Sequence, residues 1–316
     1  MNIVVTSPSF SSNKTLQQEI YKYFPKAKLN LDGKRFNKKD LIEYIKDADA
    51  IIVGLEPIDK EVLEQCPNLK IVSKYGVGLN NIDLEACKKR DITIGWTGGV
   101  NKLSVAEMTL GYMLMLCRNL FITSNELKNG IWNKSGGFQL SEKRIGIIGV
   151  GYIGKELIRL LKPFNCEILV NDIINQKEYY KENYLKEVSK EEIFKTCDIV
   201  TIHTPFDSTT DNLINKKVFE TMKNSSFIIN SARGGIINED DLKYALQNNL
   251  IAGAAIDAYV EEPPTDKELL SLPNLICTPH IGGNSREAVE AMGLSAIENL
   301  KLRIENLEAR NENNGE

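Results

Sequence analysis

Short apolar runs alternate with helix-like stretches twice along this chain of 316 residues, and this alternation limits the possible folds more than any other feature. In the first hundred residues, four short apolar runs have the length of buried parallel strands, and the stretches between them have helical spacing. The runs lie at 3–5, 50–53, 70–73 and 92–95. Strands that alternate with helices predict βαβ units, so we expect this block to form a small α/β domain with an open parallel sheet.

The second alternation begins near residue 144 and predicts a six-stranded, doubly wound sheet. The expected strands lie at 144–148, 167–170, 199–203, 226–230, 253–257 and 275–278. One long helix at 104–127, opened by a capping box at Ser104 and Glu107, is expected before this sheet. An amphipathic helix at 285–309 is expected after it, followed by a frayed polar tail, and we expect that helix to return to the first domain. The fold class is therefore two Rossmann-like or flavodoxin-like α/β domains, the second inserted in a discontinuous first.

Charge and composition exclude several classes of partner. The chain carries 39 Lys+Arg against 43 Asp+Glu, a net charge of −4, so we expect neither nucleic acid nor an anionic membrane as a partner. Its six cysteines are scattered without a Cys-x-x-Cys pair, which is typical of buried thiols in a reducing compartment and predicts no metal site. The most apolar segment, 108–121, is shorter than the ~20 residues of a membrane span, and no signal peptide is evident. We expect a cytoplasmic protein.

A Gly-x-Gly-x-x-Gly motif at Gly149, Gly151 and Gly154 follows an apolar strand and opens a helix. In this setting the first glycine permits a tight turn, the second lets a pyrophosphate approach the backbone, and the third lets helix and strand pack closely. Asp172 ends the next strand, 18 residues past Gly154, where a carboxylate can accept hydrogen bonds from ribose hydroxyls. The three residues after it include no arginine that could hold a 2′-phosphate. The motif therefore predicts NAD rather than NADP.

Further polar residues interrupt other strands at their carboxyl ends, where open α/β sheets bind ligands. Arg233, between a strand and two glycines, is placed as a clamp for a carboxylate or as a surface arginine in a turn. Glu262 follows Asp257 and is either a functional acid or part of a solvated loop. His280 lies in a Pro-His-x-Gly-Gly loop that is poorly suited to core packing. His203, the other histidine, could line a cofactor or be a hydrogen-bonded loop residue.

Together these residue types suit one reaction. A carboxylate beside an imidazole fixes its tautomer and supports general acid–base catalysis. An arginine orients a 2-oxo acid through bidentate hydrogen bonds. A nicotinamide cofactor then exchanges a hydride with carbon 2 of the acid while the histidine supplies or removes the hydroxyl proton. We expect an NAD-dependent dehydrogenase.

From about residue 51 to 300 the sequence resembles the D-isomer-specific 2-hydroxyacid dehydrogenase family, most of all its phosphoglycerate dehydrogenase-like branch. The motifs that carry the resemblance are Lys74-Tyr-Gly-Val-Gly-Leu-Asn-Asn-Ile-Asp83, Asn101 with Ser104-Val-Ala-Glu107, Gly149-Val-Gly-Tyr-Ile-Gly154, Asn230-Ser-Ala-Arg-Gly-Gly235, Asp257, Glu262-Pro263 and Thr278-Pro-His-Ile-Gly-Gly283. The resemblance implies a substrate domain at 1–99 and 284–316 and an NAD-binding domain at 100–283. It also implies a homodimer packed through the long helix after Ser104.

The resemblance assigns roles to individual residues. Arg233 is expected to bind substrate, Glu262 to support the histidine, and His280 to be the acid/base. The expected cofactor-binding residues are Gly149, Gly151, Tyr152, Ile153, Gly154, Asp172, His203, Thr204, Pro205, Thr210, Ser231, Ala232, Asp257, Gly282 and Gly283. The expected substrate-binding residues are Lys74, Gly76, Val77, Gly78 and Asn101, with the backbone N–H groups of 76–78 forming a small anion nest.

Glu56 departs from the family pattern, because the long phosphoglycerate dehydrogenases place a basic residue near this position. An acid there repels a phosphate dianion and disfavours 3-phosphoglycerate, although Lys74 could compensate, so the preferred acid stays open. Since the printed chain stops at residue 316, we do not expect control by serine through a C-terminal regulatory domain. Two alternatives share the predicted NAD binding: a non-catalytic NAD-sensing protein, like the transcriptional corepressors of this fold, and a dehydrogenase for a non-carbon acid such as phosphite.

Overall fold

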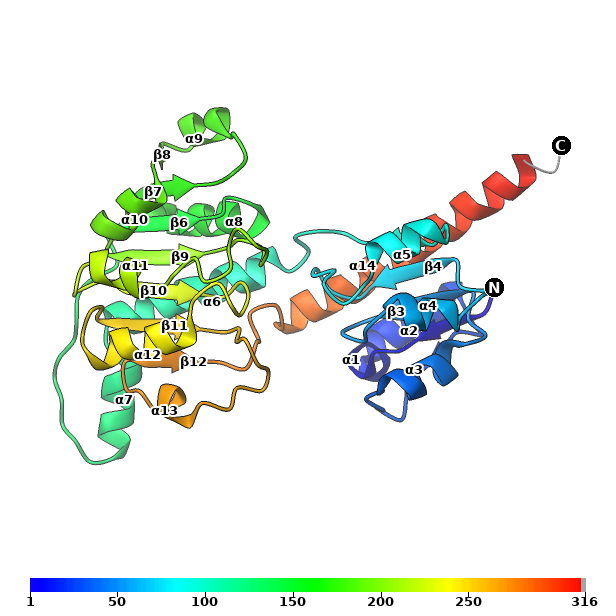
Figure 1. The fold of residues 1–316 in the computed structure, drawn as a ribbon, viewed down its shortest axis with the longest axis horizontal. Coiled ribbons are helices and arrows are strands. Elements are labelled where there is room, and N and C mark those ends of the chain that lie inside the picture. The colour runs from blue at the N-terminus through cyan, green and yellow to red at the C-terminus, as the bar shows by residue number, and fades with distance from the viewer. Residues whose placement is uncertain (314–316) are drawn as a thin grey trace. The chain divides into compact units, whose positions relative to one another are not determined.

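The structure, a computed structural model, describes residues 1–313 and divides into two compact units (Figure 1). The first unit contains residues 1–101 and the chain from Arg286 onward, and the second contains Lys102–Ser285. The boundaries expected from the sequence lay after residues 99 and 283. That the first unit binds substrate stays a prediction.

The first unit is built on a five-stranded parallel sheet with the order β2-β1-β3-β4-β5. Its strands are β1 (Ile3–Val5), β2 (Lys28–Leu29), β3 (Ala50–Val53), β4 (Ile71–Lys74) and β5 (Thr93–Gly95). The parallel α/β arrangement is confirmed. The sequence did not predict β2, because a strand of two residues has too few positions to show a periodic pattern.

Helices cover both faces of this sheet. They are α1 (Pro8–Ser12), α2 (Lys14–Tyr23), α3 (Lys38–Ile45), α4 (Lys60–Glu64), α5 (Leu84–Lys89) and α14 (Arg286–Asn313). Asn13, Asn37, Asp59 and Asp83 cap α2 to α5, each accepting a hydrogen bond from a backbone N–H of the first turn. Leu41 and Val62 pack on one face of the sheet, and Leu16 and Ile297 pack on the other.

Helix α14 returns from the end of the second unit and makes the first unit discontinuous. Its residues Met292, Ala296 and Leu300 are buried in the same cluster as Ile3 and Ile52. The helix runs to Asn313, so the tail expected to fray from residue 310 is helical as far as the structure describes it. Residues 314–316 of that expected tail lie outside the described residues.

The second unit is built on a seven-stranded parallel sheet with the order β12-β11-β10-β9-β6-β7-β8. Its strands are β6 (Arg144–Ile148), β7 (Glu167–Asn171), β8 (Lys186–Glu187), β9 (Ile199–Ile202), β10 (Phe227–Asn230), β11 (Gly253–Ile256) and β12 (Leu275–Cys277). The six expected strands are present, and β8 at the edge is the one that was missed. Both residues of β8 are exposed, so no apolar run in the sequence indicates this strand.

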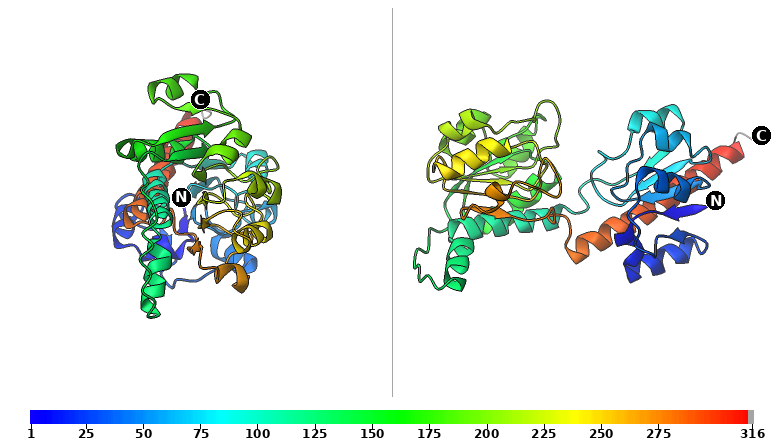
Figure 2. Two further views of the ribbon diagram at one scale, coloured as in Figure 1. Left: turned by 90° about the vertical axis from the view of Figure 1, so that its left-hand side faces the viewer. Right: turned by 60° about the horizontal axis from the view of Figure 1, so that its bottom comes forward.

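Helices also cover both faces of the second sheet (Figure 2). They are α6 (Lys102–Cys117), α7 (Leu120–Lys128), α8 (Tyr152–Leu161) with the short 3-10 helix η1 (Lys162–Phe164), α9 (Lys177–Glu182), α10 (Lys190–Thr196), α11 (Lys216–Thr221), α12 (Glu239–Gln247) and α13 (Lys267–Leu270). Met113 of α6 and Leu157 of α8 pack on Ile147 from one side. Ile193 of α10 and Phe219 of α11 lie in the cluster on the other side.

The single helix expected at 104–127 is wrong in two respects. It breaks between α6 and α7 with a bend of 65°, because Asn119 adopts a left-handed conformation with φ 52° and ψ 25°. It also begins at Lys102, so Ser104 is no N-cap and the capping box does not form. The Ser104 hydroxyl instead donates to the carbonyl of Gly282 (2.7 Å) and accepts from the backbone N–H of Ser285 (3.3 Å).

Among the helices of residues 1–313, no single one is long and apolar enough to cross a membrane. The bent pair α6 and α7 meets that criterion of length and composition when its two helices are taken together.

The break at Asn119 makes a prediction about stability. Glycine accepts the left-handed conformation without strain, whereas alanine does not, so Asn119→Ala should be about 1 kcal/mol less stable than Asn119→Gly. Both variants lose the hydrogen bond from Asn119 Nδ2 to the Ser135 carbonyl. The difference between their free energies of unfolding therefore reports the cost of the left-handed backbone alone. Urea unfolding checks this, with Asn129 as the matched control. Its φ of −94° predicts that Asn129→Ala is at least as stable as Asn129→Gly, and the same order at both sites would contradict the argument.

Candidate active site

The second sheet changes direction between β6 and β9. The chain moves outward from β6 to β8 on one side and from β9 to β12 on the other, and ligands of open α/β sheets bind beyond the carboxyl ends at such a switch point. Gly149 follows β6 with φ 93°, and a Cβ atom there would lie 2.7 Å from the His203 carbonyl oxygen beyond β9. A Cβ on Gly154 would lie 2.3 Å from the Gly149 carbonyl oxygen. The glycine loop therefore fits closely against its neighbours.

Gly151 is different from these two glycines, because a Cβ there would meet no atom within 4 Å. It directly precedes α8, so this open space lies at the first turn of the helix, where backbone N–H groups and the helix dipole attract an anion. Tyr152 and Ile153 form that first turn, and Tyr152 is exposed. This arrangement fits the pyrophosphate of a dinucleotide.

Asp172 lies directly after β7, beside the glycine loop. Its carboxylate accepts from the backbone N–H groups of Val150 (2.6 Å) and Ile174 (2.8 Å). A carboxylate can accept about four hydrogen bonds, so Asp172 retains capacity for ribose hydroxyls. The position of the acid is thus fixed by the loop that would hold the phosphates.

The segment after β9 contains two buried polar atoms that have no partner among residues 1–313, Nδ1 of His203 and Oγ1 of Thr204. His203 Nε2 is bonded to Thr201 Oγ1 (3.0 Å), and burial lowers the pKa of His203 to about 3, so the ring is neutral. Thr210 closes this loop by donating to the Pro205 carbonyl (2.9 Å). Unpartnered buried atoms beside the glycine loop are consistent with a polar ligand there.

Arg233 follows β10 in a turn that Asn230 organises. Asn230 accepts from the Ala232 N–H (3.0 Å) and donates to the Arg233 carbonyl (2.8 Å). Ser231 shares a hydrogen bond with Thr109 of α6 (2.9 Å). Burial lowers the pKa of Arg233 and the nearby Glu262 raises it, so a partly buried cation lies beside this acid.

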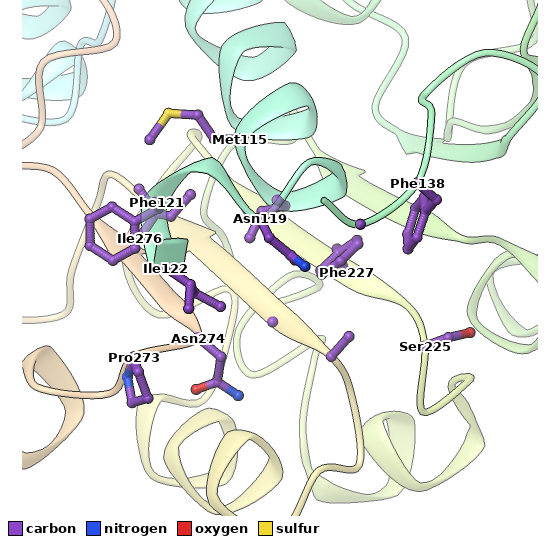
Figure 3. Close-up of a pocket in the computed structure, with 14 residues that line it drawn as sticks. Met115, Asn119, Phe121, Ile122, Phe138, Ser225, Phe227, Pro273, Asn274 and Ile276 are labelled. Atoms are coloured by element: carbon purple, nitrogen blue, oxygen red, sulfur yellow. The ribbon is translucent and has the colours of Figure 1, made fainter. Parts of the chain in front are cut away.

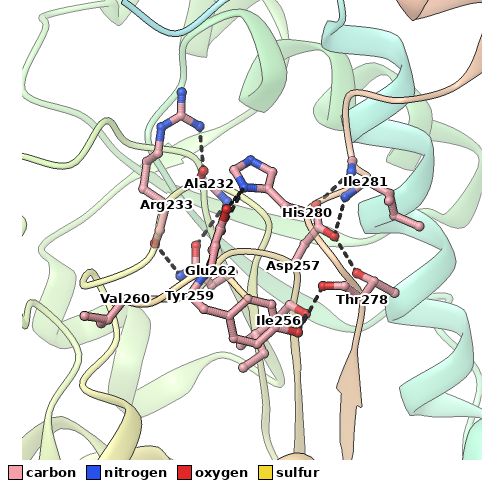
Figure 4. A network of polar contacts seen from close by, with 12 residues as sticks. Ala232, Arg233, Ile256, Asp257, Tyr259, Val260, Glu262, Thr278, His280 and Ile281 are labelled. Carbon is pink, nitrogen blue, oxygen red and sulfur yellow. Dashed lines mark hydrogen bonds and ion pairs between the residues drawn. The ribbon is translucent and has the colours of Figure 1, made fainter. Parts of the chain in front are cut away.

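His280 and Glu262 form an ion pair or hydrogen-bonded pair, with Nδ1 of the histidine 2.8 and 2.9 Å from the two carboxylate oxygens (Figure 4). Glu262 Oε1 also accepts from the Tyr259 N–H (3.2 Å). His280 Nε2 makes no hydrogen bond to any described residue. His280 has a positive φ of 53°, which is uncommon for a residue with a side chain, so the loop holds its backbone in a restricted conformation.

Asp257 holds the loop that carries His280. It is 1% exposed, and it accepts from the Thr278 hydroxyl (2.5 Å), the Ile281 N–H (2.9 Å) and the Gly282 N–H (2.7 Å). Its carboxylate thus binds the segment on both sides of His280. Gly283 follows directly in the same loop.

Two tyrosines that no sequence motif marks also support this loop. Tyr112 of α6 is hydrogen bonded to the Thr278 hydroxyl, and Tyr259 donates to the Thr278 carbonyl (3.0 Å). Burial raises the pKa of both tyrosines well above the ordinary range, so they remain protonated. Tyr112 lies within an apolar helical pattern that gives no sign of a polar contact.

In the first unit, Lys74 ends β4 and is 5% exposed. It donates to the Gly54 carbonyl and to Asn81 Oδ1 (2.7 Å). Gly76, with φ 134°, begins the predicted anion nest that continues through Val77 and Gly78. Oδ1 of Asn101 is buried without a partner among the described residues, which marks a polar atom still available to a ligand.

Glu56 lies at the switch point of the first sheet, since β1 and β3 are neighbours there. Its Oε2 accepts from the Thr6 hydroxyl (3.0 Å) beyond β1 and from the Gly54 N–H (2.9 Å) beyond β3. The Glu56 carboxylate therefore accepts hydrogen bonds from two groups that lie where sheets of this class bind ligands.

A pocket of about 190 Å³ lies at the amino-terminal ends of β10 and β11, the ends away from Arg233 and Asp257 (Figure 3). Its lining includes Met115, Phe121, Ile122, Phe138, Phe227 and Ile276. None of the residues that line it is charged, so this pocket has no group to move a proton or bind a carboxylate.

His203 makes the stability of the protein depend on pH. Its pKa is about 3 when folded and about 6.5 when unfolded, so between these values the unfolded chain alone binds the proton. The contribution of His203 is complete above pH 6.5 and is lost as the pH falls, by up to about 1.4 kcal/mol per pH unit. Urea unfolding at about pH 7 and about pH 5 should show a smaller loss for His203→Gln than for the wild type. An equal loss would mean that the ring is protonated when folded.

Comparison with known proteins places this geometry in a family. Residues 110–282 match the NAD binding domain of the D-isomer specific 2-hydroxyacid dehydrogenases. The D-3-phosphoglycerate dehydrogenase of Methanocaldococcus jannaschii is 36% identical over 84% of this chain, but the match covers 51% of that protein. This chain thus spans about half the length of such relatives.

Two further proteins match over nearly their whole length. The hydroxypyruvate reductase of Thermotoga maritima is 32% identical over 87% of this chain and 91% of its own. The solved structure of the TT0316 protein from Thermus thermophilus is similar with a TM-score of 0.88 and 27% identity, covering 97% of each chain. With its NAD-binding domain matched over 110–282, the chain belongs to the D-isomer-specific 2-hydroxyacid dehydrogenase family.

Proposed function

We propose that this protein is an NAD-dependent dehydrogenase that interconverts a small D-2-hydroxy acid and its 2-oxo acid. The observation that carries the proposal is the hydrogen bond between His280 Nδ1 and the Glu262 carboxylate, beside the partly buried cation of Arg233. These groups lie in the same unit as the glycine loop at Gly149. The names of the relatives, a D-3-phosphoglycerate dehydrogenase and a hydroxypyruvate reductase, support the same reaction class.

His280 moves the proton in this proposal. The Glu262 carboxylate accepts the hydrogen of Nδ1 and thereby holds the tautomer whose Nε2 is free to bind a proton. In oxidation Nε2 takes the proton of the substrate hydroxyl, and in reduction it returns a proton to the carbonyl oxygen. Glu262 stabilises the imidazolium that forms when the proton is taken.

Arg233 binds and orients the acid. A guanidinium offers two parallel N–H groups to a carboxylate, or one each to a carboxylate and a carbonyl oxygen. Its present bond to the Ala232 carbonyl (2.7 Å) involves Nη1 and leaves its other nitrogens for the substrate.

The dinucleotide would be held by the first turn of α8 at its pyrophosphate and by Asp172 at its ribose. When bound, NAD supplies or accepts the hydride. The other predicted cofactor contacts lie in the loops that follow β9 to β12 of the same unit. They are His203, Thr204, Pro205, Thr210, Ser231, Ala232, Asp257, Gly282 and Gly283. The residues of this chain would bind and orient the cofactor, and the cofactor would carry the hydride.

For the first unit, we propose that Gly76, Val77 and Gly78 donate their N–H groups to the substrate carboxylate, with Lys74 and Asn101 as further substrate-binding residues. The buried, unpartnered Oδ1 of Asn101 supports this role. Glu56 at the switch point of that sheet favours an acid without a phosphate group.

We propose that the chain forms a homodimer through α6 and α7. Leu120 and Leu127 of α7 and the nearby Trp132 are at least half exposed, and an interface would bury these apolar side chains. Light scattering of the purified chain would check the dimer. The cytoplasmic location expected from the sequence stays a prediction.

Replacing His280 should remove the proton transfer and spare cofactor binding. Asparagine tolerates a positive φ, so His280→Asn tests the imidazole without straining the backbone. We expect turnover to fall by about 10²- to 10⁴-fold, with the Kd for NADH unchanged. The assay is NADH oxidation with hydroxypyruvate, glyoxylate, pyruvate, 2-oxoglutarate and 3-phosphohydroxypyruvate. Wild-type turnover in the variant would exclude His280 as the acid/base, and silence of the wild type on all five acids with NADH bound would favour a sensing role.

Glu56 should set the preference between phosphorylated and unphosphorylated acids. Glu56→Arg should raise kcat/KM for 3-phosphohydroxypyruvate relative to hydroxypyruvate by about 10-fold or more, because it replaces repulsion of the phosphate by attraction. Glu56→Gln is the matched control, since it keeps an acceptor for Thr6 and Gly54 and removes only the charge. An unchanged ratio in both variants would show that Glu56 does not face the substrate.

A further inference from the structure

The loop that carries Glu262 is held by a second acid, which lies outside the acid/base pair. Glu239 is the first residue of α12 and follows the N-cap Asn238. Its Oε1 accepts from the backbone N–H of Val260 at 2.7 Å. Val260 itself is 70% exposed, so its own side chain adds little packing, although Tyr259 before it is buried. The hydrogen bond to Glu239 is therefore a main restraint on Val260.

The turn that carries Arg233 meets the same peptide group. A Cβ on Gly234 would lie 1.9 Å from the Tyr259 carbonyl oxygen and 2.6 Å from the Val260 nitrogen. The backbone after Arg233 is thus in direct contact with the Tyr259–Val260 peptide. Glu239 fixes the direction of the N–H of this peptide, and Gly234 allows its close approach.

This restrained segment also contacts Glu262 directly. The Tyr259 N–H, one residue before the peptide, donates to Glu262 Oε1 (3.2 Å), and the same oxygen lies 2.8 Å from His280 Nδ1. A rotation of the segment would therefore move a donor of the carboxylate that orients the imidazole. Glu239 can act on the histidine through two hydrogen bonds and without touching it.

The surroundings of Glu239 are acidic, although its place in the first turn of α12 favours a negative charge. Burial raises its pKa, as do the charges of Asp240, Asp266 and Glu262, while the bond from Val260 lowers it. The nearest cation on the same helix, Lys243, is bonded to Asp266 (2.7 Å). Because Glu239 lies among other acids, its hydrogen bond to the Val260 N–H explains its presence better than a gain in stability does.

We propose that Glu239 is a positioning residue of the reaction, which holds the Tyr259–Val260 segment so that Glu262 orients His280 and lies correctly beside Arg233. This inference rests on the proposed function, because it assumes that Glu262 and His280 carry out the proton transfer.

The test begins with four single variants of the full chain. Glu239→Ala removes the acceptor, and Glu239→Asp keeps the charge but withdraws it by one methylene, so it serves if the alanine variant does not fold. Glu239→Gln restores an acceptor without the charge. Asp240→Asn is the matched control, because the neighbouring Asp240 loses the same charge from an exposed side chain that does not contact the loop.

We expect Glu239→Ala and Glu239→Asp to lower kcat by about 10- to 100-fold with unchanged Kd for NADH. Hydrogen exchange of the peptide around Val260 should become faster in both, and Glu239→Gln and Asp240→Asn should behave as the wild type. In a double-mutant cycle, Glu239→Ala should add nothing to the loss caused by Glu262→Gln. Wild-type kcat in Glu239→Ala or Glu239→Asp, or additive losses in the cycle, would overturn the proposal. Wild-type kcat in Glu262→Gln would instead overturn the proposed function.

Discussion

The Asp257 carboxylate is the group on which the arrangement of the candidate site depends. Removing a carboxylate from water costs several kcal/mol unless hydrogen bonds replace the lost hydration, and Asp257 receives three of them. All three donors belong to the segment 278–282 that contains His280. The histidine, whose side chain is 45% exposed, is thus placed by a buried acid that directly follows β11 and not by packing of its own ring.

Much of this organisation could be predicted from the sequence, for a physical reason. Strands covered by helices on both faces must be apolar throughout, so short apolar runs marked them correctly. A polar residue that follows such a run lies at the carboxyl edge of a parallel sheet, and all carboxyl edges lie on the same side. The sequence alone therefore predicts that Arg233 after β10, Glu262 after β11 and His280 after β12 lie at one edge.

What could not be predicted depends on contacts between distant segments. The break at Asn119 interrupts a pattern that is apolar on both sides, and its left-handed backbone is favoured by the bond to the Ser135 carbonyl. Ser104 has the local sequence of a helix cap, but it binds Gly282, which is 178 residues away. Glu239 resembles any acid in a first helical turn, and only the course of the 257–262 loop shows that it accepts a hydrogen bond there.

The hydroxyl groups beneath the loop also determine where protons can travel. Thr278 has one hydroxyl hydrogen, which it gives to Asp257, so Tyr112 must be the donor in its bond to Thr278. Tyr259 directs its hydrogen at the Thr278 carbonyl, and burial keeps both phenols protonated. Tyr112 Oη also lies 3.4 Å from Met108 Sδ, and Tyr259 Oη lies 3.4 Å from the Ile256 carbonyl oxygen, so both phenol hydrogens are held among acceptors of this layer. For the proposed reaction, this leaves the exposed side of the His280 ring as the side where its proton meets substrate and solvent.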